Sequence, residues 1–272
     1  MELKLAFSPC PNDTFAFHAM INSLVDTEGL SFNVYMADVE ELNNLAKKGE
    51  LDICKLSYHA YFSLLSNYIM LTSGSALGFN NGPLLVKKEG TIFNPNNVIA
   101  IPGEHTTAAL LLKTAYKNCT NLKPMLFSKI ENAILNNEVN AGVLIHEGRF
   151  TYKSKGLELI TDLGEFWQNN FHHPIPLGGI AVKRNMPIDL AKKINRVLRR
   201  SIEYAFLHPD KSSSFITDNA QEITKEVQEK HIKLFVNNFT LDIGEEGMEA
   251  VEFMYSKYCI ENNFNKNKLF IE

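Results

Sequence analysis

Residues 3–25 read LKLAFSPCPNDTFAFHAMINSLV, and this stretch decides the fold class. Large apolar residues alternate with polar or small ones over its first five positions, which is the pattern of a half-buried β-strand. Two prolines then break the pattern, and a largely apolar run begins at Phe15. We therefore predict a strand, a turn and a helix, with Asn12 or Asp13 capping the helix through a short side chain that accepts from its free N–H groups.

The same strand-and-helix pattern repeats along the chain. Strands are predicted at residues 30–36, 52–56, 97–102 and 141–145, and helices at residues 39–48, from Ser57 onward and at 106–116. Strands that alternate with helices are typical of an α/β fold built on parallel sheets. From Pro187 onward the sequence is mostly helical.

Two extended segments, residues 83–88 and 176–183, are flanked by or contain glycines. Such a pair can act as the two crossover strands of a hinge. A chain of 272 residues also exceeds the usual size of one domain. We therefore predict a two-lobed α/β protein: residues 1–88 and 178–272 form the larger, discontinuous lobe, and residues 89–177 form the smaller one.

Composition limits the partners and the compartment. The net charge of −4 and the lack of a basic stripe argue against nucleic acid and anionic membranes as partners. The cysteines are far apart, at positions 10, 54, 119 and 259, which argues against zinc and disulfides and favours a reducing compartment. The N-terminus lacks the pattern of a secretion signal, and no apolar run approaches the roughly 20 residues of a membrane span. We predict a cytoplasmic protein; nothing in the sequence indicates an oligomeric state.

Three segments offer polar groups where a predicted strand passes into a helix. They are residues 8–14, 55–57 and 105–107. Hydroxyl groups or a cation beside the free N–H groups of a helix suit a small anion such as a carboxylate. In an open α/β sheet the ligand crevice lies at these strand ends. The alternative is that each segment only caps its helix.

His146 is the candidate for chemistry. It follows the apolar strand predicted at residues 141–145, where a side chain would face the crevice, and an imidazole can take up a proton near neutral pH. A structural role for this histidine stays open. Cys10 and His59 are weaker candidates, because no histidine lies near Cys10 in the sequence to activate its thiol, and His59 is expected to pack.

Several motifs, in order along the whole chain, resemble the 1,4-dihydroxy-6-naphthoate synthase family of the futalosine route to menaquinone. The motifs are SPCPNDTF at 8–15, KLSY at 55–58, GSALG at 74–78, GEHTTA at 103–108, IHEGRFTY at 145–152 and LDIGEEG at 241–247. This resemblance implies a periplasmic-binding-protein-like fold of the second type, used for catalysis.

The resemblance also implies the reaction and its residues. The substrate would be cyclic dehypoxanthine futalosine, a small anion, which is split to 1,4-dihydroxy-6-naphthoate without a metal or an organic cofactor. The family's proposed base falls on His146, and its substrate contacts fall on Lys55, Leu56, Ser57, Thr106 and Thr107. Two alternatives remain: a solute receptor, which would need an export signal, and the sister enzyme chorismate dehydratase, which lacks the motif at residues 8–15.

Overall fold

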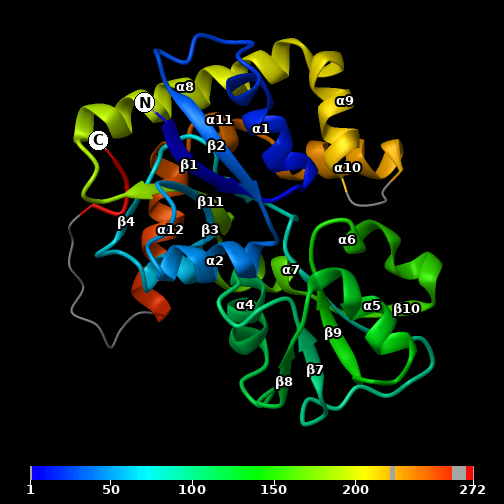
Figure 1. Cartoon of the computed structure of the whole chain (residues 1–272). Helices are drawn as coiled ribbons and strands as arrows, with labels where there is room; N and C mark the ends of the chain where they lie inside the picture. Colours follow the sequence, from blue (N-terminus) through cyan, green and yellow to red (C-terminus); the bar gives the residue numbers. More distant parts are fainter. Residues whose placement is uncertain (1, 221–223, 259–267, 272) are drawn as a thin grey trace. The chain divides into compact units, whose positions relative to one another are not determined.

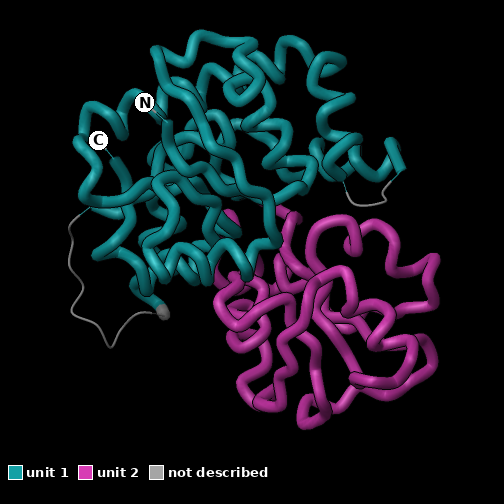
Figure 2. Tube along the Cα trace, viewed as in Figure 1, with its two compact units in different colours: residues 1–78, 176–272 teal, residues 79–175 magenta. Residues whose placement is uncertain are grey.

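A computed structural model describes residues 2–220, 224–258 and 268–271 of the chain (Figure 1). The chain forms two compact units (Figure 2). Unit 1 comprises residues 1–78 and 176–272, and unit 2 comprises residues 79–175. Residues 83–88 were predicted to belong to the larger lobe, but strand β6 (Leu84–Lys88), which makes up most of this segment, pairs within the sheet of unit 2.

Unit 1 is built on a mixed sheet with the strand order β2-β1-β3-β11-β4, and β5 also pairs with β11. Its strands are β1 (Glu2–Phe7), β2 (Ser31–Met36), β3 (Ile53–Ser57), β4 (Tyr68–Met70), β5 (Ala76–Gly78) and β11 (Ile175–Lys183). Strand β1 runs parallel to β2 and β3.

The helices of unit 1 cover this sheet. They are α1 (Pro11–Ile21), α2 (Val39–Lys47), α3 (Tyr58–Phe62), α8 (Ile188–Leu207), α9 (Pro209–Asn219), α10 (Lys225–Phe235), α11 (Asn238–Leu241) and α12 (Gly244–Tyr258). Helix α1 packs against α8, α9 and α10 (Figure 1). The core joins β1 to α1 and α8 through fully buried side chains such as Phe7, Phe17 and Val197. Within the described ranges, no helix is long and apolar enough to cross a membrane.

Unit 2 has a smaller sheet with the strand order β10-β6-β9-β7-β8. Besides β6, its strands are β7 (Ile99–Ile101), β8 (Leu122–Pro124), β9 (Ala141–Leu144) and β10 (Leu157–Asp162). Its helices are α4 (Thr107–Ala115), α5 (Phe127–Leu135), α6 (Gly148–Thr151) and α7 (Leu163–Phe171), with a short 3-10 turn at Tyr152–Lys155. Ile130 and Ile134 of α5 pack on β9 to form the core of this unit.

Both sheets are mixed: the predicted parallel pairing is found between β1 and its neighbours β2 and β3 and between β7 and its neighbours β8 and β9, and other pairs are antiparallel. Strand β11 is antiparallel to β3 and β4, and β6 is antiparallel to β9 and β10. The antiparallel strands β6 and β11 correspond to the two segments that were predicted as the crossover strands of a hinge. Local periodicity marks where these strands lie but not their direction, because the direction depends on partners far away in the sequence.

Helix α1 begins earlier than predicted. Its first residue is Pro11, whose fixed φ suits the first turn of a helix, and the N-cap is Cys10 without a side-chain cap hydrogen bond. The predicted capping by Asn12 or Asp13 is therefore wrong. Both side chains lie inside the first turn and are bonded to other polar groups.

Candidate functional site

The turn from β1 into α1 holds a buried carboxylate. Asp13 is only 2% exposed. Its Oδ2 accepts from the Ser8 backbone N–H at 3.2 Å and from the Ser8 hydroxyl at 2.7 Å, and its Oδ1 accepts from Asn12 Nδ2 at 2.8 Å. Burying a charge is costly unless it is paired and hydrogen-bonded, so these donors explain why a carboxylate is tolerated here.

Lys55 supplies the opposite charge. Its Nζ lies 2.6 Å from Asp13 Oδ1, and the two side chains are 8% and 3% exposed. The ammonium group from β3 is thus balanced by the carboxylate from α1, inside unit 1. Lys55 was predicted to contact the substrate, but its charge is already paired with that of Asp13.

Leu56 is fully buried, and its backbone pairs with Gly179 of β11. The neighbouring Gly178 approaches the same strand closely: a Cβ added there would lie 2.6 Å from the Leu56 carbonyl oxygen. A larger residue at position 178 would push β11 away from β3. The side chain of Leu56 lies in the core, so Leu56 contributes to a ligand site only through the position of its backbone.

Ser57 ends β3 and is the N-cap of α3, but its hydroxyl makes no cap hydrogen bond. Instead, Asn43 of α2 binds it twice: Asn43 Oδ1 accepts from the Ser57 backbone N–H at 3.1 Å, and Asn43 Nδ2 donates to Ser57 Oγ at 3.3 Å. Ser57 is 3% exposed and Asn43 is fully buried. The position of the serine is therefore set by a second element of unit 1.

Thr106 and Thr107 lie at the N-terminus of α4 in unit 2, and both are buried. The Thr106 hydroxyl accepts from the Ala109 backbone N–H at 3.2 Å and donates to the Gly103 carbonyl at 2.8 Å. Thr106 thus caps its helix. Thr107 is the first helical residue, where backbone N–H groups have no intrahelical partner and the helix dipole favours a negative charge.

His146 follows β9 in unit 2 and has a left-handed backbone, with φ at +53°. For a residue with a Cβ this conformation costs roughly 1–2 kcal/mol, and such strain concentrates at functional sites. Its ring is half-buried and meets the edge of Phe127, with centroids 5.1 Å apart and an interplanar angle of 67°. The imidazole is neither enclosed in the core nor fully exposed.

Glu147 follows His146 and is half-buried. Burial is the main reason that the pKa of its carboxyl lies above the usual value of 4.5, and the charge of Glu131 adds to the rise, while Lys155 opposes it. A carboxyl that resists ionisation beside the candidate base is a feature that the sequence analysis missed. A carboxyl next to a histidine in sequence gives no sign of its burial.

We expect Glu147→Gln to stabilise the protein at neutral pH. A carboxyl whose pKa is raised by folding binds more protons in the folded state than in the unfolded state, so wild-type stability falls as pH rises from about the unfolded pKa through the folded pKa. The amide does not titrate. Urea unfolding at several pH values should show a higher free energy of unfolding for the variant than for the wild type at pH 7. This difference should vanish below pH ~4. A gain that grows toward acid pH would contradict the assignment.

The polar network of residues 8–13 reaches a buried histidine of helix α10. His231 of α10 is fully buried, its Nε2 lies 3.0 Å from Asn12 Oδ1, and its ring packs on Phe235 with centroids 4.6 Å apart. Cys10 is also buried in this turn, and His59 lies in α3. Cys259 lies outside the described residues.

Asn43 lies outside the segments that the sequence predicts at the crevice, whereas Asp13 lies within one of them, residues 8–14. Asn43 has one signal, a polar residue on the buried face of an amphipathic helix between Leu42 and Ala46. Asp13 was read as a helix cap. Their partners lie 14 and 42 residues away in sequence, so no local pattern connects them.

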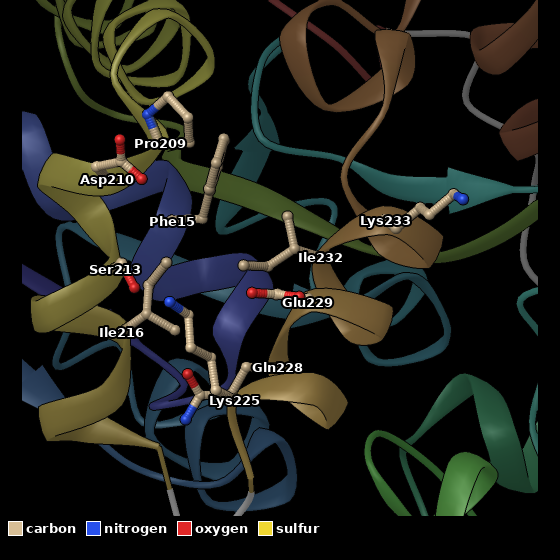
Figure 3. A pocket seen from close by; sticks show the side chains of 10 residues that line it. All are labelled: Phe15, Pro209, Asp210, Ser213, Ile216, Lys225, Gln228, Glu229, Ile232 and Lys233. Atoms are coloured by element: carbon tan, nitrogen blue, oxygen red, sulfur yellow. The ribbon is translucent and has the colours of Figure 1, made fainter.

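A cavity of about 270 Å³ lies in unit 1 between α1, α9 and α10 (Figure 3). Its walls combine apolar, acidic and basic side chains: Phe15, Pro209, Asp210, Ser213, Ile216, Lys225, Gln228, Glu229, Ile232 and Lys233. In Figure 3 the side chain of Lys233 points away from the other labelled residues. None of the residues predicted to bind substrate lines this cavity.

Comparison with known proteins covers nearly the whole chain. A family profile described as menaquinone biosynthesis matches residues 3–259. A curated protein of Thermus thermophilus named 1,4-dihydroxy-6-naphtoate synthase is 38% identical over 94% of this chain and 93% of its own length. A Streptomyces coelicolor protein of the same name is 35% identical over 95% of this chain and 93% of its own length.

Solved structures agree on the architecture. Protein AF1704 from Archaeoglobus fulgidus has a TM-score of 0.87 and 33% identity, with 94% of this chain and 96% of that chain covered. The Candida albicans CA3427 product, described as having the generic periplasmic binding protein fold, has a TM-score of 0.64 and 15% identity over 93% of this chain and 90% of its own. The expected periplasmic-binding-protein-like fold is confirmed.

Proposed function

This chain belongs to the menaquinone biosynthesis family, and from that membership we propose its substrate and the residues that act on it. The protein is an enzyme of menaquinone biosynthesis that forms 1,4-dihydroxy-6-naphthoate in a lyase-type reaction, the activity for which its curated relatives are named. The substrate we propose is cyclic dehypoxanthine futalosine, which would be split into the naphthoate and a small sugar-derived fragment.

We propose His146 as the general base. The observation that carries this role is the half-buried ring at the end of β9, held on a left-handed backbone within the matched sequence. Loss of a proton from the carbocyclic part of the substrate would break a carbon–carbon bond and leave an aromatic ring system. Aromatisation would supply the driving force, so this step calls for no metal or organic cofactor.

The proposed substrate contacts differ in what they can offer. Ser57 can donate its hydroxyl to an oxygen of the substrate, and the first turn of α4, at Thr106 and Thr107, offers backbone N–H groups and a positive dipole end. Lys55 is paired with Asp13, so the substrate would meet a neutral pair rather than a free cation. Leu56 would act by fixing the backbone of β3. These groups hold negative charge and orient the substrate.

We also propose that the enzyme is cytoplasmic and that it binds neither nucleic acid nor membranes. The support is the net charge of −4, which gives no attraction to phosphate groups, and the widely separated cysteines, which suit a reducing compartment.

The experiment is a direct assay. Purified protein is incubated with cyclic dehypoxanthine futalosine, and 1,4-dihydroxy-6-naphthoate is followed by its near-ultraviolet absorbance and identified by mass spectrometry. Binding without product would favour a solute receptor. Loss of water from chorismate, with no reaction of the futalosine compound, would favour the sister enzyme. Either result would overturn the proposed function.

A further inference from the structure

Arg149 of α6 is a charged residue for which the proposed reaction has no role. It follows His146 by three positions, and its side chain is 15% exposed. Its guanidinium group donates from Nη2 to the Asn80 carbonyl at 2.9 Å and from Nη1 to the Gly82 carbonyl. Nη2 also donates to Asp162 Oδ2 at 2.6 Å. One side chain thus joins the turn after β9 to two other segments of unit 2.

The two segments that accept these bonds are fixed to each other. Asp162 pairs with Leu84 where β10 runs antiparallel to β6, and its Oδ1 caps α7 by accepting from the Gly164 backbone N–H at 2.8 Å. A Cβ added at Gly82 would lie 2.3 Å from the Gly164 Cα, so the backbones of the two segments are in direct contact. The guanidinium group therefore binds to a rigid frame made of paired strands and a helix N-terminus.

The turn that carries His146, by contrast, is short and needs support from outside. Helix α6 has four residues, which is too few to be stable by itself, and its N-cap Glu147 makes no side-chain cap hydrogen bond. The Arg149 backbone N–H donates to the His146 carbonyl at 3.4 Å, and the Thr151 hydroxyl reaches Glu131 of α5 at 3.4 Å. Both distances are longer than those of ordinary hydrogen bonds. A left-handed backbone such as that of His146 persists only where the surrounding structure enforces it.

We propose that Arg149 is a positioning residue: it anchors the turn after β9 so that the imidazole of His146 is held in place for proton removal. The inference rests on the proposed function for the role of His146. Arg149 itself does not bind the substrate, because its charge is paired with Asp162 and its other bonds are directed at backbone carbonyls. A reacting group displaced by about 1 Å can lose a factor on the order of 100 in rate, so an anchor three residues away can control turnover.

Arg149→Met tests this, because methionine keeps an apolar stem but removes every bond of the guanidinium group. We expect kcat to fall by about 10-fold to 100-fold and KM to stay within about threefold, since the proposed contacts at Ser57 and at the start of α4 are unaltered. A raised KM with unchanged kcat would mean that the guanidinium group binds the substrate, and would overturn the proposal. Wild-type turnover in this variant would overturn it as well.

Arg149→Lys is the milder variant for the case in which Arg149→Met does not fold. Lysine keeps the charge but lacks the planar fork that reaches three acceptors. We expect a kcat between those of the wild type and Arg149→Met, again without a matching rise in KM. Wild-type kcat in Arg149→Lys would show that the bonds to the two carbonyls do not position the base.

Lys87→Met is the matched control. Lys87 of β6 is 13% exposed and donates to Glu158 Oε2 of β10 at 2.5 Å, so it forms an ion pair across the same two strands, at the end opposite to Asp162. We expect this variant to change kcat by less than about twofold, because the lost pair is distant from the turn after β9. A loss of kcat as large as that in Arg149→Met would assign the effect to general destabilisation of unit 2 and contradict the proposal.

The effect of Arg149 should also depend on His146. In a His146→Asn background, Arg149→Met should lower kcat by less than about twofold, because the group that it positions is gone. Losses that multiply in the double variant would show that Arg149 acts independently of the imidazole, and the inference would fail.

Hydrogen exchange measures the anchor without substrate. In Arg149→Met the backbone amides of residues 146–152 should exchange at least about 10-fold faster than in the wild type, since the charge-assisted bonds that hold the turn are lost. In Lys87→Met they should exchange at the wild-type rate. Unchanged exchange in Arg149→Met would refute the anchor even if the enzyme is active. If the wild type instead fails to convert the futalosine compound, the proposed function fails, and the exchange rates still decide whether Arg149 holds this turn.

Discussion

His146→Ala is expected to lower kcat by about 100-fold to 10,000-fold, the range that a positioned general base contributes, while the substrate still binds within a few fold of wild type. The imidazole is the proton acceptor in the proposed reaction, whereas the groups that hold the substrate lie elsewhere, at Ser57 and at the start of α4. Single-turnover kinetics give the rate, and calorimetry on the slow variant gives the affinity.

The matched control for His146→Ala is His146→Asn. The backbone at this position is left-handed, and asparagine tolerates that conformation better than alanine does. His146→Asn therefore keeps the local backbone while removing the base. Both variants should lose turnover to a similar extent, and His146→Asn should unfold at a urea concentration close to that of the wild type. Wild-type turnover in the asparagine variant would remove His146 from its proposed role.

The local patterns of the sequence predict much of this fold, because they depend on residues close together in the chain. Alternation over residues 3–7 and the proline-rich turn mark β1 and the start of α1, and Ser57 and Thr106 mark the starts of α3 and α4. The direction of β11 could not be predicted in the same way. An extended, glycine-containing strand fits a sheet in either direction, and only its partners decide.

The candidate site shows the same contrast between features that are local in sequence and features that depend on distant residues. A histidine after an apolar strand is visible in the sequence, but its left-handed backbone is not, since glycine and asparagine are the residues that usually signal that conformation. Lys55 looks like a free cation at a strand end. Only the fold places Asp13 beside it, 42 residues away in the chain, and turns a candidate anion-binding group into half of a buried ion pair.

That ion pair leads to the largest expected effect on stability: Asp13→Asn should lower the free energy of unfolding by about 3–5 kcal/mol, as expected when one partner of a buried pair is removed. Both carboxylate oxygens accept hydrogen bonds, Oδ2 from Ser8 and Oδ1 from Asn12 and Lys55. An amide must therefore turn its NH₂ toward donors on one side. Within the described residues, Lys55 would also lose its one ion-pair partner.

Lys55→Met should cost less than Asp13→Asn, because the carboxylate keeps its hydrogen bonds to Ser8 and Asn12 while methionine fills much of the volume of the lysine stem. In the double variant no charge is left unpaired, so it should regain much of the stability lost in Asp13→Asn. Urea unfolding of the four proteins gives the coupling energy of the pair. If Asp13→Asn does not fold, the free energies of unfolding of Lys55→Met and of the double variant can still be compared. That comparison shows what the unpaired Asp13 carboxylate costs.

The same four proteins separate stability from substrate binding. If Lys55 acts only through its pair with Asp13, the neutral double variant should bind substrate within a few fold of wild type, because Ser57 and its hydroxyl stay in place. A loss of affinity of 100-fold or more in a well-folded double variant would mean that the ammonium group reaches the substrate itself. Additive losses of stability in the two single variants would mean that the 2.6 Å contact between Lys55 and Asp13 carries no coupling.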